Sequence, residues 1–254
     1  MNKYFKRFKL VSSLGFLFTG IIANYSLNDW LKNELDIASK ENDPLSVKDK
    51  QRIMIIEQAF RDLGFKGPLD VLLKEGLSYR AVTYISPQGC AAVVGAPLDR
   101  DYPLSDEDLY AIAGHEAAHV LHNHGLLQQM LILAILSSAS GVLSLGALLL
   151  LCRPVSQLCE ADADITSAIK LNTAKTLIKL MDGEEFRAHN DFNTPLSKNI
   201  ARFFSTHPLT DTRINYLSPF VTDAPLPLFK SERYHQILEE RAQAAPEEKR
   251  GLAP

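Results

Sequence analysis

The sequence predicts an α+β fold in which a small β-sheet lies beside a mostly helical body with a hydrophobic helical hairpin. Short β-rich runs lie between residues 69 and 94, and most later segments repeat apolar residues near helical period. An uncharged stretch of 27 residues, 126–152, interrupts the helical part. A chain of 254 residues has room for one core-forming domain, placed at 43–220, with extensions at both ends.

Turn and cap residues set the boundaries of the predicted elements. Asp43-Pro44 opens a first helix that ends near Gly64. Gly76 and Pro87-Gln88-Gly89 separate three predicted strands, which are 69–73, 81–85 and 90–94. The helical pattern after the uncharged stretch predicts helices at 157–169, 173–182, 195–204 and 209–217.

A further helix is predicted to begin at Ser105, where Ser105-Asp106-Glu107-Asp108 has the form of a capping box with acidic residues in the first turn. Apolar residues from Leu109 onward follow helical period and predict a face turned to the core. Inside this helix lies an HExxH motif formed by His115, Glu116 and His119. Histidines at i and i+4 share one face and can reach one metal ion, with Glu116 beside them as a general base toward water.

The motif alone is weak evidence, because satisfied core histidines are common, so the third ligand matters. The metzincin pattern needs a glycine at position 122 and a histidine at 125, whereas the chain has His122 and Gly125. A deformylase-like site would use Cys90, which lacks any supporting motif and is better explained as a small buried hydrophobe.

The best third ligand is Glu160, in the segment Glu160-Ala161-Asp162-Ala163-Asp164. On a helix, Glu160 and Asp164 share a face, so that Glu160 can bind the metal and Asp164 can hydrogen-bond the outer nitrogen of a ligating histidine. A register with Asp162 as the aspartate would place Gln157 or Leu158 at the ligand position and is disfavoured. Glu-x-x-Ala-Asp after an HExxH helix is the gluzincin pattern.

Together these motifs resemble those of the HtpX-type and CAAX-prenyl-protease-type zinc metallopeptidases. The resemblance covers roughly residues 45 to 220 and rests on four pieces in the same order. They are His115-Glu116-x-x-His119 with His124 five residues later, Glu160-x-x-Ala163-Asp164, Thr206-His207-Pro208-Leu209-Thr210-Asp211-Thr212-Arg213-Ile214, and, more weakly, Pro87-Gln88-Gly89 with Ala91 to Val94 and Leu98.

The resemblance implies a zincin-like domain with one Zn²⁺ held by His115, His119 and Glu160, leaving a fourth position open. Glu116 would take a proton from the attacking water and pass it to the leaving amine. Asp164, His207 and Arg213 would support the site by packing and hydrogen bonding rather than by direct chemistry. Three candidates remain open for the group that donates to the oxyanion: Tyr84, Tyr102 and His207.

An edge strand next to the zinc helix is also implied, on which an extended substrate could lie by strand addition. This strand would be formed by Cys90, Ala91, Ala92, Val93 and Val94. For His122, three residues after His119, a structural role is favoured over ligation, because Glu160 completes the protein ligand set. The three cysteines, which are Cys90, Cys152 and Cys159, form no disulfide framework.

Residues 1–24 are predicted to be a signal peptide or an uncleaved membrane anchor. A basic start is followed by fourteen uncharged, mostly apolar residues at 10–23, and Ile21-Ile22-Ala23 offers a cleavage site. This build predicts a membrane-associated, exported protein of the bacterial periplasm or cell envelope. The segment is short for a full span, which takes about twenty residues.

The uncharged stretch 126–152 is long enough for a transmembrane helix, but one crossing would separate His119 from Glu160. The chain must therefore return, and Ser137-Ser138-Ala139-Ser140-Gly141 supplies helix-weakening residues for a turn. Each arm spans roughly 16 Å, about half the hydrocarbon thickness. Two interpretations stay open: a hairpin or flap that dips into the membrane, and an apolar core hairpin of a soluble enzyme.

The C-terminal part, 221–254, is predicted to be an extension that leaves the domain at Pro225-Leu226-Pro227 and ends in a solvated tail from Ala242.

A net charge of −3 gives no sign of the basic surface that binds nucleic acid. The sequence thus predicts a zinc metalloendopeptidase acting on membrane-proximal or misfolded polypeptides. The alternative is a catalytically silent peptide-binding or chaperone-like module with the same fold. No oligomeric state is predicted.

Overall fold

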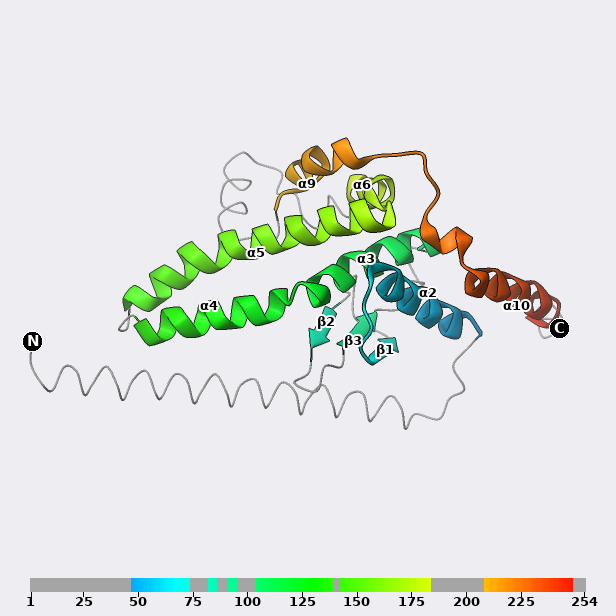
Figure 1. Ribbon diagram of the computed structural model, residues 1–254, viewed down its shortest axis with the longest axis horizontal. Helices are drawn as coiled ribbons and strands as arrows, with labels where there is room; N and C mark the ends of the chain where they lie inside the picture. The colour runs from blue at the N-terminus through cyan, green and yellow to red at the C-terminus, as the bar shows by residue number, and fades with distance from the viewer. Residues whose placement is uncertain are drawn as a thin grey trace, which may run out of the picture. The chain divides into compact units, whose positions relative to one another are not determined.

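The computed structural model describes residues 47–73, 82–85, 91–95, 104–138, 142–183 and 208–248 (Figure 1). The chain divides into two compact units. One comprises residues 1–42, 123–161 and 192–208, and the other comprises 43–122, 162–191 and 209–254. Most of the described residues are helical, which confirms the predicted helical body. The predicted segments 1–24 and 195–204 lie outside the described residues.

In the first unit, helix α4 (His124–Ser138) and the first part of α5 (Val142–Leu171) account for the uncharged stretch. The two helices run in opposite directions (Figure 1). Several large apolar side chains of α4 are exposed, namely Leu126, Leu127, Met130 and Ile132. Among the helices that the structure describes, none is both long and apolar enough to cross a membrane.

The second unit contains a three-stranded sheet of β1 (Leu69–Leu73), β2 (Val82–Ile85) and β3 (Ala91–Gly95) in the order β1-β3-β2. Strand β3 pairs in parallel with β1 and antiparallel with β2, with Val93 opposite both Val71 and Thr83. The prediction of an edge strand at 90–94 is therefore wrong. The central strand of the described sheet contains Ala91, Ala92, Val93 and Val94, and both of its sides are already hydrogen-bonded to a neighbouring strand. Cys90 lies outside the described residues.

Helices α2 (Val47–Leu63) and α3 (Asp106–Leu121) pack together over the main core of this unit. Ser105 and Asp108 form the predicted capping box at the start of α3, each side chain accepting from the other residue's backbone N–H. The fully buried Tyr110 donates a hydrogen bond of 2.6 Å to Asp62 at the end of α2. The core side chains shared by the two helices are Ile55, Ile56, Ala59, Phe60, Ala113, Ala117 and Val120.

A second core lies where α6 (Ala174–Asp182) and α9 (Thr210–Leu217) meet the opposite side of α3 and the last turns of α5. Its buried side chains are Ala111, Ala168, Ala174, Leu177, Met181 and Leu217. Small residues on α3 and α5 let larger side chains from α6 and α9 fill this core. The short 3₁₀ helix η1 (Ser218–Phe220) follows α9 directly.

The C-terminal part differs from the prediction that the domain ends at 220. After η1, the chain forms a second 3₁₀ helix, η2 (Pro227–Lys230), and helix α10 (Glu232–Glu248). Leu226 and Leu228 are buried in the same core as α2, and Arg241 of α10 binds Asp106 through two nitrogens at 2.6 and 3.0 Å. The prolines turn the chain but do not release it, because Leu226 and Leu228 enter the core.

Candidate metal centre

Close packing at Gly114 sets the HExxH motif against the last turns of α5. A Cβ atom at Gly114 would lie 2.6 Å from Cδ1 of Leu171 and 2.7 Å from Oγ of Ser167. Both distances are too short for any larger residue, so the glycine permits this close approach of α3 and α5. Asp164 lies one helical turn before Ser167 on α5, and the next residue of α3 is His115.

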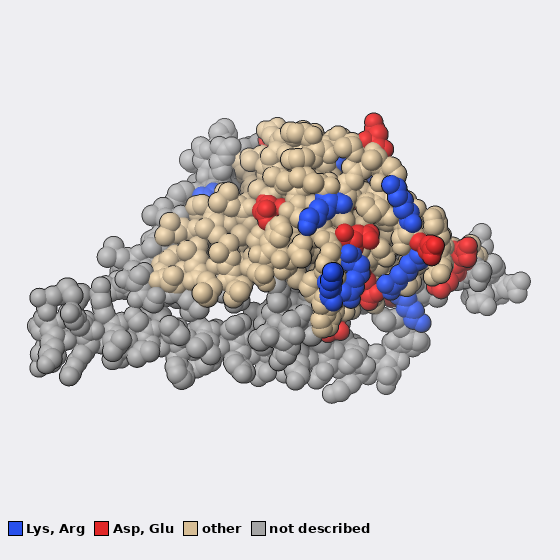
Figure 2. All heavy atoms as spheres, in the orientation of Figure 1, with Lys and Arg blue, Asp and Glu red and all other residues tan. Residues whose placement is uncertain are grey.

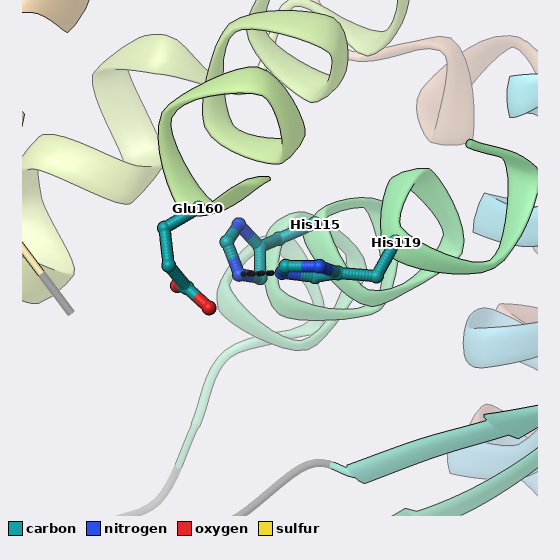
Figure 3. Close-up of side chains that lie close together, drawn as sticks. All are labelled: His115, His119 and Glu160. Atoms are coloured by element: carbon teal, nitrogen blue, oxygen red, sulfur yellow. Dashed lines mark hydrogen bonds between the residues drawn. The ribbon is translucent and has the colours of Figure 1, made fainter. Parts of the chain in front are cut away.

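The two histidines of the motif converge through the same ring atom. Nε2 of His115 lies 3.1 Å from Nε2 of His119, and the ring planes are inclined by 77° (Figure 3). Two nitrogens bound to one tetrahedral zinc at about 2.0–2.1 Å would lie about 3.3 Å apart. The separation of the two nitrogens therefore fits a shared metal ion.

Glu160 comes from α5, and its carboxylate is turned toward the two imidazoles (Figure 3). The side chain is buried, and its ligand oxygen and the ligand nitrogens of His115 and His119 all lie within 4.8 Å of one another. Two imidazoles and one carboxylate are a set of donors that suits Zn²⁺ and leaves a fourth coordination position. The structure thus brings together the three side chains that the sequence predicted as ligands.

Asp164 lies against the other ring nitrogen of His115. Its carboxylate is completely buried, and Oδ1 lies 2.8 Å from Nδ1 of His115. Arg213 of α9 donates to both carboxylate oxygens, from Nε at 2.8 Å and from an Nη at 2.7 Å. Burial alone would raise the pKa of Asp164, but His115 and Arg213 outweigh it and hold the pKa well below its usual range. The charged carboxylate favours a proton on Nδ1 of His115, which makes Nε2 the ring nitrogen that would bind a metal.

Tyr216 is a further member of this group that the sequence analysis missed. Its hydroxyl donates a hydrogen bond of 2.5 Å to Oδ2 of Asp164. Burial, together with the neighbouring Asp164 charge, raises the pKa of Tyr216, so the phenol stays protonated and remains a donor. Its position three residues after Arg213, on the same face of α9, is the sequence signal that could have identified it.

The other predicted site residues are placed as follows. Glu116 lies on α3 between the two histidines and is partly exposed. Tyr84 lies on β2, the strand that approaches α3. Cys90, Tyr102 and His207 lie outside the described residues.

A helix that presents two converging histidines, with a carboxylate supplied by a second helix, forms a group that could hold one metal ion in the way that metallohydrolases do. The chain belongs to peptidase family M48, whose family model matches residues 48–220. This is a family of zinc metallopeptidases of the HtpX and CAAX-protease type, so the resemblance drawn from the motifs is confirmed. No curated protein sequence and no solved structure matches the chain.

Proposed function

We propose that the protein is a zinc-dependent endopeptidase whose metal is held by His115, His119 and Glu160. The observation that carries this proposal is the 3.1 Å approach of the two Nε2 atoms beside the buried carboxylate. When bound, zinc supplies a Lewis acid for the peptide carbonyl and lowers the pKa of water. The residues of the chain supply the proton transfer, the orientation of the ligands and the support for the substrate.

Glu116 is the general base in this proposal. It neighbours His115 in the sequence and lies on the same helix as both histidines, and its partial exposure leaves it accessible to water. Its carboxylate takes a proton from the attacking water and returns that proton to the leaving amine. Asp164, held by Arg213 and Tyr216, keeps His115 oriented throughout.

The substrate strand is reassigned to β2. In the described sheet, β2 is an edge strand, and it is the strand that lies against α3. An extended peptide can add to such an edge by main-chain hydrogen bonds, which accommodate internal segments of a polypeptide as well as its ends. This mode of binding supports cleavage within a chain rather than trimming from an end.

Zinc content tests the ligand set. Glu160→Ala removes one of the three proposed protein ligands. Loss of a residue that only hydrogen-bonds a ligand lowers metal affinity roughly 10–100-fold, so we expect the loss of zinc affinity here to be larger. The measurement is metal content after dialysis of the full chain against buffered zinc, followed by mass spectrometry. Glu239→Ala, on the exposed side of α10, is the matched control and should retain zinc. Undiminished zinc in Glu160→Ala would refute the assignment.

We also propose that the enzyme acts at a membrane surface, on membrane-proximal or misfolded polypeptides of the cell envelope. Leu126, Leu127 and Met130 on α4 expose more than half of their surface. In Figure 2 the acidic and basic side chains gather over α2 and α10, while the surface over α4 is almost free of them. An apolar surface of this kind typically marks a contact with lipid or with another protein.

Vesicle flotation tests this placement. A chain that begins at residue 25 should float with lipid vesicles, whereas the same chain with Leu126→Gln, Leu127→Gln and Met130→Gln should remain at the bottom of the gradient. The exposed residues Leu238 and Val221, changed to Gln, provide the control, since they lie outside α4. If all three chains stay with the soluble fraction, the membrane proposal fails.

A further inference from the structure

The chain turns sharply where α3 ends, and two histidines flank the turn. His122 caps α3, its backbone N–H bonding to the carbonyl of Ala118. The next residue, Asn123, has a φ of 55°, in the left-handed region that asparagine tolerates better than most residues. His124 then begins α4 and is buried. The turn therefore holds the imidazoles of His122 and His124 close together, on either side of Asn123.

Asp162 of α5 meets this turn. Its Oδ2 contacts Nδ1 of His122, and the ligand atoms of His122, His124 and Asp162 all lie within 4.8 Å of one another. The side chains of His122 and Asp162 are 33% and 49% exposed, so solvent reaches the group. In contrast, both carboxylates that face His115, those of Glu160 and Asp164, are buried.

Helix geometry keeps this second group separate from the first. Successive residues on an α-helix are rotated by about 100°, so Glu160 and Asp162, two positions apart, point to different sides of α5. His122 lies beyond the last turn of α3, three residues after His119. The two groups share no ligand, and each has two imidazoles and one carboxylate.

We propose that His122, His124 and Asp162 form a second, exchangeable site for a divalent transition-metal ion. Two imidazoles with a carboxylate suit Zn²⁺, Co²⁺, Ni²⁺ or Cu²⁺, whereas Mg²⁺ and Ca²⁺ prefer oxygen ligands alone. To bind the ion, the exposed side chains of His122 and Asp162, which now touch, would move apart. A bound ion would link the turn after α3 to α5, the helix that carries Glu160. The proposal does not depend on peptidase activity.

Zinc titration of the full chain, purified without a polyhistidine tag, tests the proposal. Equilibrium dialysis should show one tightly bound zinc ion and a second, weaker one. Asp162→Asn and His122→Gln should each weaken the second ion at least tenfold and leave the first in place. In a His119→Ala background, in which the first site has lost a ligand, the weaker ion should persist and then disappear when Asp162→Asn is added.

Asp211→Asn on α9 and His235→Gln on α10 are matched controls, because both residues are exposed and lie outside the two groups. As a second measurement, Co²⁺ added to the zinc-loaded protein should give visible absorption bands that Asp162→Asn lacks. The proposal is overturned if the wild type binds a single zinc ion, or if Asp162→Asn takes up the second ion as the wild type does. In either case, the contact of His122 with Asp162 holds no metal ion.

Discussion

Glu116→Gln is expected to lower the rate of casein hydrolysis by about 10²–10⁴-fold, the range that general-base catalysis contributes. Glutamine has nearly the same shape as glutamate but cannot accept the proton of the attacking water. Because the proposed ligands His115, His119 and Glu160 are unchanged, zinc content should equal that of the wild type. The measurement compares initial rates of casein cleavage, and of self-cleavage, by zinc-loaded proteins.

Glu107→Gln provides the matched control for this prediction. It makes the same chemical change on the same helix, but Glu107 is exposed in the first turn of α3, away from the histidines. It should retain wild-type activity. Equal activity of Glu116→Gln and wild type would exclude the proposed mechanism, whereas absence of activity in both, with zinc bound, would favour the silent peptide-binding module.

The convergence of the proposed metal ligands could be predicted because helix period fixes which residues share a face. His115 and His119 are four apart, as are Glu160 and Asp164, so each pair is placed by its own helix. Tyr216 was missed because its contact with Asp164 depends on how α9 docks against α5, 52 residues away in sequence. The contact of His122 with Asp162 likewise joins two helices, across 40 residues. Local periodicity carries no information about such docking.

The errors in the predicted fold have the same origin. Hydrophobic runs located the three strands to within a residue or so, but sequence order does not fix sheet order, and β1 pairs with β3 rather than with its neighbour β2. The prolines at 225 and 227 correctly indicate a break. Whether the chain then leaves the domain depends on Leu226 and Leu228 finding space in the core, which they do. Both outcomes are decided by packing between distant segments.

Arg213→Met is expected to lower the free energy of unfolding by about 3–5 kcal/mol, the cost of breaking a buried ion pair by removing one partner. Asp164 is fully buried and Arg213 nearly so, and methionine retains apolar volume while removing both hydrogen bonds to the carboxylate. The measurement is urea unfolding of the metal-free proteins, so that zinc binding does not contribute to stability. Lys175→Met, which breaks an exposed pair with Asp223, should change stability by no more than about 1 kcal/mol.

The double variant Arg213→Met with Asp164→Leu separates the stabilising role of the pair from its role at the metal site. Replacing both charged partners with apolar residues removes the unpaired buried charge, so much of the lost stability should return. Zinc affinity should nevertheless stay about 10–100-fold below that of the wild type, because His115 has lost the carboxylate beside Nδ1. Wild-type zinc affinity in the double variant would show that Asp164 stabilises the fold without orienting His115.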